Sequence, residues 1–176
     1  LCGNNIITGG GTIDSDSGYK VSGVTILNTG VSPSSLQIGC NSKALAIAST
    51  AVGVATCATG VASIAFGCRT CSSGPSSIAI GNNSESHNIY SISIGNSISK
   101  GRCGVALGYS WACYDGSVAI GDRVIGNANY SSVIGTNISN SNECSFGLGW
   151  YDGGMGFENP TISFSNTSSY IYGCGA

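Results

Sequence analysis

The stretch Ser77-Ile78-Ala79-Ile80-Gly81 is repeated as Ser91-Ile92-Ser93-Ile94-Gly95 exactly one period later, and the period is fourteen residues. A fixed period of this kind indicates a repeat architecture. Counting these two, eight copies can be aligned on their glycine, and the other six end at Gly39, Gly53, Gly67, Gly108, Gly121 and Gly135. The spacing shortens to thirteen before Gly108 and again before Gly121. We expect a one-residue deletion in each of these turns.

The residues before each glycine alternate in size. A large apolar residue stands one position before it, and the residue three positions before it is also apolar except for Thr50 and Ser132. The residue between them is mostly Ala or Ser. Successive side chains of a strand point to opposite faces, so the alternation predicts a strand. Fourteen residues fit two strands of about five residues and two short turns, with the glycine at a tight corner. The predicted fold is all-β, a parallel β-roll in which each repeat forms one turn.

The alternation also suggests which face is buried. We predict that the large columns face inward and that the small column faces outward. Because solvent-facing strands usually carry longer polar residues, we further predict that another copy of the chain packs on the small column. The alternative is a small-residue column in contact with solvent. The residues of this expected oligomer face are Ala51, Ala65, Ala79, Ser93, Ala106 and Ala119.

The composition excludes several functions. Of the 176 residues only 8% are charged and the net charge is -2, which is not the electrostatic footprint of a nucleic-acid-binding protein. No apolar run approaches the roughly 18 residues of a membrane helix. His87 is the single histidine and the carboxylates are dispersed, so no acid–base pair recurs. We expect no enzymatic activity and no cofactor.

Nine cysteines are present, an odd number that leaves at least one without a partner in the chain. Cys57 and Cys71 are one period apart. Their α-carbons should lie about 4.8 Å apart, inside the disulfide range. We predict adjacent thiols that a disulfide could join. Cys68 and Cys71 form the one C-x-x-C motif, without the further ligands of a zinc site, so we expect no metal site.

Three aromatic residues, Tyr109, Trp111 and Tyr114, interrupt the small-residue pattern where the period shortens. Aromatic side chains are enriched at recognition surfaces, so these three are candidate binding residues. Packing of an irregular turn or of an oligomer contact explains them equally well. Both interpretations stay open at this point.

The repeat resembles the YadA-like head of trimeric autotransporter adhesins, whose signature reads roughly Asn-Ser-Val-Ala-Ile-Gly. The best matches are residues 77–81, 91–95 and 116–121, and the resemblance covers about 34–149. It implies a left-handed parallel roll, a side-by-side homotrimer and a role in attachment on the outside of a cell. Similar rolls occur in phage and viral fibres, which assemble in a reducing cytoplasm, and the many cysteines favour that setting.

The period divides the chain into three parts. Residues 34–149 form the repeat domain, 1–33 an N-terminal β cap or connector, and 150–176 a C-terminal β cap or the start of a further domain. The predicted function is a non-enzymatic, extracellular trimeric fibre segment that attaches to a host or cell surface through a protein or glycan receptor. The alternative is a purely structural virion or filament subunit that associates only with itself.

Overall fold

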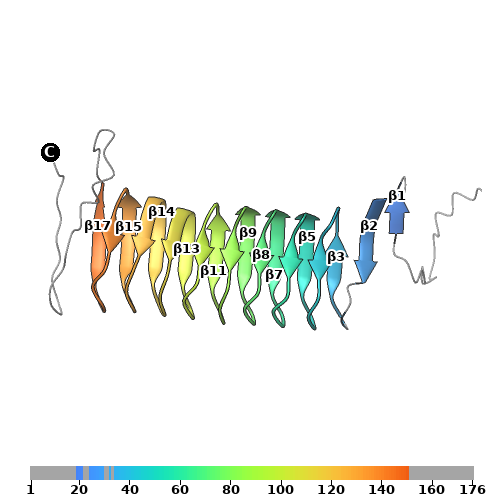
Figure 1. The fold of residues 1–176 in the computed structure, drawn as a ribbon, viewed down its shortest axis with the longest axis horizontal. Coiled ribbons are helices and arrows are strands. Elements are labelled where there is room, and N and C mark those ends of the chain that lie inside the picture. Colours follow the sequence, from blue (N-terminus) through green and yellow to red (C-terminus); the bar gives the residue numbers. More distant parts are fainter. Residues whose placement is uncertain (1–18, 22–23, 30–31, 33, 151–176) are drawn as a thin grey trace, which may run out of the picture.

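The chain folds into a parallel β-solenoid of about eight turns, drawn as a row of strands in Figure 1. The computed structural model describes residues 19–21, 24–29, 32 and 34–150. Every regular element among these residues is a strand, and none is helical. The predicted fold class is confirmed.

Each of the eight aligned repeats contributes a first strand that contains or precedes its glycine, and β17 adds a ninth strand of the same kind. These strands are β3 (Leu36–Ile38), β5 (Thr50–Val54), β7 (Ile64–Cys68), β9 (Ile78–Asn82), β11 (Ile92–Gly95), β13 (Val105–Ala112), β14 (Val118–Gly126), β15 (Ser132–Thr136) and β17 (Phe146–Trp150).

A short second strand follows on the opposite side of the turn. The separate second strands are β4 (Lys43–Ala44), β6 (Cys57–Ala58), β8 (Cys71–Ser72), β10 (Glu85–Ser86), β12 (Ile98–Ser99) and β16 (Ser139–Asn140). In β13 and β14 the first and second strands merge into one longer element.

Neighbouring turns pair in parallel and in register with the repeat. Ile64 lies opposite Ile78, and Gly67 lies opposite Gly81. Equivalent residues therefore form ladders along the whole roll. Each position of the repeat corresponds to one straight column of side chains.

Two antiparallel strands precede the roll. β1 (Tyr19–Val21) pairs with β2 (Val24–Thr29), and β2 pairs with β3, placing Leu27 opposite Ile38. β2 therefore covers the first edge of the solenoid, where exposed backbone groups could otherwise pair with another chain. Apart from these strands, the predicted segments 1–33 and 150–176 lie almost entirely outside the described residues.

The predicted assignment of the two faces is wrong, because the small column lies inside the roll and the large columns lie outside. Ala65 is completely buried, whereas Ile64 and Phe66 on either side of it are 39% and 52% exposed. The two strands of a turn therefore face each other mainly through Ala and Ser, and the columns of Ile, Leu and Phe stay outside. Among the described residues, the larger apolar side chains of the interior are Val124, Val133 and Ile138, all in the later turns.

The expected oligomer face is therefore part of the interior. All six of its residues have no exposed surface in the single chain and cannot contact another copy: Ala51, Ala65, Ala79, Ser93, Ala106 and Ala119.

The serine at the start of most repeats closes the turn that precedes it. The hydroxyls of Ser77, Ser91 and Ser117 each donate a hydrogen bond of 2.6 Å to the backbone carbonyl three residues earlier. All three side chains are buried. These bonds allow a polar residue to occupy the interior, because a buried hydroxyl with a partner avoids the cost of desolvation.

The glycine corner requires both a left-handed backbone and the absence of a side chain. Gly67 has a φ of +130°, and a Cβ added there would lie 1.9 Å from the carbonyl oxygen of Gly81 in the next turn. All eight repeat glycines have a positive φ, as the sequence predicts.

The deletion expected in each shortened turn is found at one position. Ordinary turns have a left-handed non-glycine residue two positions after the repeat glycine, such as Arg69 or Asn83, with a φ near +54°. The turns after Gly95 and Gly108 lack this residue. In the turn after Gly121 this residue is present again, as Arg123. The extra residue causes the register shift between β13 and β14, where Tyr109 pairs with Asp122 but Ser110 pairs with Val124.

Candidate functional site

The outer side of the first strands carries a continuous strip of large apolar side chains, which we call the apolar face. All of its residues are partly or well exposed. The strip crosses nine strands, so it is about 38 Å long at the usual strand spacing. Its residues are Leu36, Ile38, Val52, Ile64, Phe66, Ile78, Ile80, Ile92, Ile94, Val105, Leu107, Val118, Ile120, Ile134, Phe146 and Leu148.

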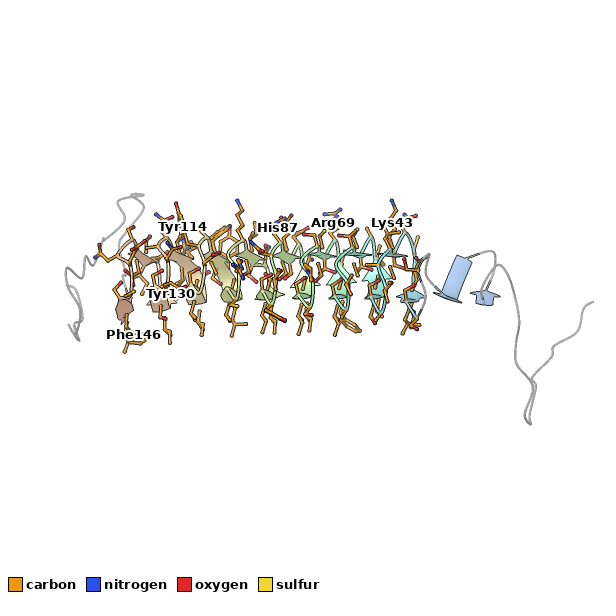
Figure 2. The ribbon with its side chains drawn as sticks, turned by 90° about the horizontal axis from the view of Figure 1, so that it is seen from below. Lys43, Arg69, His87, Tyr114, Tyr130 and Phe146 are labelled. Atoms are coloured by element: carbon orange, nitrogen blue, oxygen red, sulfur yellow. The ribbon has the colours of Figure 1, made fainter. Side chains whose placement is uncertain are left out.

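The outer side of the second strands differs in character, and we call it the polar face. Its columns include Lys43, Glu85, His87 and Lys100. Figure 2 shows Lys43, Arg69, His87 and Tyr114 along one edge of the roll, with Phe146 at the opposite edge. The two faces therefore point away from each other, and a partner on the apolar face leaves the polar face open.

Two of the three predicted aromatic residues meet on β13. The ring centroids of Tyr109 and Trp111 are 4.8 Å apart with an interplanar angle of 65°, an edge-to-face pair. Tyr109 is 41% exposed and Trp111 is half-buried. Tyr114 lies in the short loop that follows β13 and is also exposed. Its backbone carbonyl accepts a hydrogen bond from the hydroxyl of Ser117.

The register adds neighbours that the sequence alone did not indicate. Trp111 lies between Ile98 on β12 and Ile125 on β14, and these three residues form an apolar patch on the polar face. Asp122 lies opposite Tyr109 and is exposed. We call these three apolar residues together with Tyr109 the aromatic patch; its members are Ile98, Tyr109, Trp111 and Ile125. The thirteen-residue spacing could have revealed Ile98, since it stands one short period before Trp111.

Cys57 and Cys71 are direct neighbours on the polar face. β6 and β8 pair with Cys57 opposite Cys71, the position that their spacing predicts. Both are free thiols and half-buried. The pKa of Cys71 is raised to about 11, mainly by burial. Electrostatic repulsion by Cys57 and a hydrogen bond to Cys57 act in the same direction. The disulfide itself stays a prediction.

The same ladder continues into charged residues on both sides. Lys43 lies opposite Cys57 in the preceding turn, and Glu85 lies opposite Cys71 in the following one. Glu85 Oε2 is 2.9 Å from His87 Nε2, with both side chains about 40% exposed. An exposed pair of this kind contributes little to stability.

The other described cysteines are dispersed. Cys68 lies opposite Val54 and Asn82 and is not paired with Cys71. Burial raises the pKa of Cys113, and nearby Lys100 partly opposes that shift. Among the described residues, no three His, Cys, Asp or Glu side chains gather in a way that could hold a metal ion.

The described part of the chain contains no helix of the length and hydropathy needed to cross a bilayer. No protein-family model matches the chain, and no curated protein matches it either.

Proposed function

We propose that this chain is a non-enzymatic segment of an extracellular trimeric fibre that attaches to a host or cell surface. The observation that carries the proposal is the apolar face. Soluble monomers rarely expose contiguous apolar patches larger than a few hundred Å², and larger ones mark interaction sites. A straight strip along the whole roll suits a partner that is equally long and straight.

A second and third copy of the same chain are the partners that fit best. Each copy presents the same ladders at the same spacing, so apolar columns of neighbouring rolls can pack side by side along their full length. Homo-oligomers of soluble proteins favour closed symmetry. The resemblance of the repeat to YadA-like heads supports three as the number of copies and a left-handed roll.

The polar face remains open in such an assembly and is the side on which we place attachment. The aromatic patch lies there, with Tyr109 exposed beside the carboxylate of Asp122. Exposed aromatic rings stack on sugars and anchor protein partners. A glycan or a protein on a host surface is therefore the proposed receptor class.

One observation favours the alternative of a purely structural virion or filament subunit. Trp111 is half-buried between Ile98 and Ile125, and its ring contacts Tyr109 within the same chain. Packing alone accounts for that arrangement. In this second candidate function, self-association through the apolar face is the whole role of the chain.

Light scattering of the full chain tests the oligomer. We expect a trimer for the wild type and a monomer or aggregate for the double variant Ile78→Asn with Ile92→Asn. Ser73→Asn, on the polar face, is the matched control and should remain trimeric. A monomeric wild type, or a trimer that tolerates both apolar substitutions, would contradict the proposal.

A further inference from the structure

We propose that Cys57 and Cys71 form a two-coordinate site for a soft monovalent metal ion, with Cu(I) as the ion of choice. The proposal rests on the ladder geometry of these two residues and is independent of the proposed function. It departs from the expectation of no metal site and gives the predicted thiol pair a different chemistry from a disulfide.

The separation of the two thiols favours a bridging ion over a direct bond. In a parallel ladder the two Cα–Cβ bonds are themselves parallel, so the Cβ atoms stay about 4.8 Å apart, the strand spacing. A disulfide needs Cβ atoms about 3.8 Å apart and sulfurs only about 2.0 Å apart. Forming one would pull adjacent turns together against backbone hydrogen bonds, such as that of 2.8 Å from the Cys57 N–H to the Thr70 carbonyl.

A metal ion between the sulfurs needs no such movement. Two bonds of the zinc–thiolate length, about 2.3 Å, in a straight line span about 4.6 Å, and the shorter bonds of a two-coordinate ion span slightly less, which is close to the strand spacing. Thiolates select Cu(I) among the biological metals, and Cu(I) accepts two ligands in a linear arrangement. Zinc requires four ligands, which the described residues do not gather around this pair.

The charges on the two sides of the thiol pair act in opposite directions on the complex that would form. Binding replaces two S–H protons, which pass to solvent, by one Cu(I), so the bis-thiolate complex carries one negative charge. Lys43 lies next to Cys57 on one side and can offset that charge. On the other side, the carboxylate of Glu85 lies opposite Cys71 and opposes a negative charge there, although it also contacts His87.

Copper competition on the full reduced chain tests the site. The probe is Cu(I) held by bicinchoninate, a coloured chelator that reports the copper it loses. We expect the wild-type chain to take one Cu(I) from the chelator and the serine variants of the pair to take less. Cys57→Ser and Cys71→Ser should each weaken that binding at least 100-fold, while Cys68→Ser and Cys113→Ser should leave it unchanged.

Serine already occupies this column at Ser139, so the variants should fold, and circular dichroism checks that they do. X-ray absorption of the loaded wild type should show two sulfur neighbours and no third. Equal copper binding by the wild type and Cys57→Ser would overturn the proposal. So would a reduced pair that leaves Cu(I) with the chelator yet forms a Cys57–Cys71 disulfide with oxidised glutathione.

Discussion

At the residue scale, the stability of the interior depends on whether each buried hydroxyl group has a hydrogen-bond partner. Ser86 lies 2.6 Å from the hydroxyl of Ser91 and Ser72 lies 2.6 Å from that of Ser77, and all four are buried. Ser99 occupies the equivalent position but faces Gly104 in place of serine, and its buried hydroxyl has no hydrogen-bond partner.

Ser99→Ala should therefore stabilise the chain, because it removes a buried polar group without a partner. We expect the free energy of unfolding to rise by about 1 kcal/mol. Ser86→Ala is the matched control and should lower it by about 1 kcal/mol, because a hydrogen bond is lost. Denaturant unfolding of both variants measures the difference, and equal effects of the two substitutions would contradict this explanation.

The titration of Cys71 gives a second test at this scale. Alkylation by iodoacetamide requires the thiolate, so its rate at Cys71 should rise with pH to a midpoint of about 11, above the ordinary thiol value of 9.0. Because the folded pKa is raised, this thiol favours the folded state below pH 9 and loses that effect as pH rises toward 11. In Cys57→Ser the midpoint should fall. A wild-type midpoint near 9 would show that burial and Cys57 do not act as described.

At the element scale, the glycine corner is the least tolerant part of each turn. Gly67→Ala would place a methyl group against the backbone of the next turn and hold alanine at a φ of +130°. We expect a loss of at least about 3 kcal/mol in the free energy of unfolding, measured by denaturant titration. Asn83→Ala is the control, because Ala55 already adopts a φ of 54° in the same column. A small effect of Gly67→Ala would mean that neighbouring turns can separate locally.

At the scale of the whole molecule, the two faces have separate proposed roles. Tyr109→Ala combined with Trp111→Ala should abolish binding of the full chain to receptor-bearing cells or immobilised glycans. The trimer mass should not change, because both residues lie away from the apolar face. Lys100→Ala, on the polar face, is the control. Loss of assembly together with binding would favour the structural alternative, in which these rings support packing.

Most of the architecture could be predicted from the sequence. The period, the strands, the left-handed glycines and the position of Cys57 opposite Cys71 all follow from local alternation and regular spacing. The aromatic patch could be predicted only in part. Tyr109 and Trp111 stood out as exceptions to the repeat. Counting from the glycines, however, places Val124 opposite Trp111, and the register shift at Arg123 places Ile125 there.

The sequence by itself determined that one turn of solenoid forms every thirteen or fourteen residues, because alternation and glycine spacing are properties of a single strand and its corner. Only the tertiary structure decided which side of that strand is buried. Alternation places Ala65 and Ile64 on opposite faces without saying which is inside. Which face is inside depends on how the two strands of a turn close on each other, a contact between segments that are separate along the chain. Here the Ala and Ser column faces the opposite strand and is buried, whereas the large columns beside the repeat glycine are exposed.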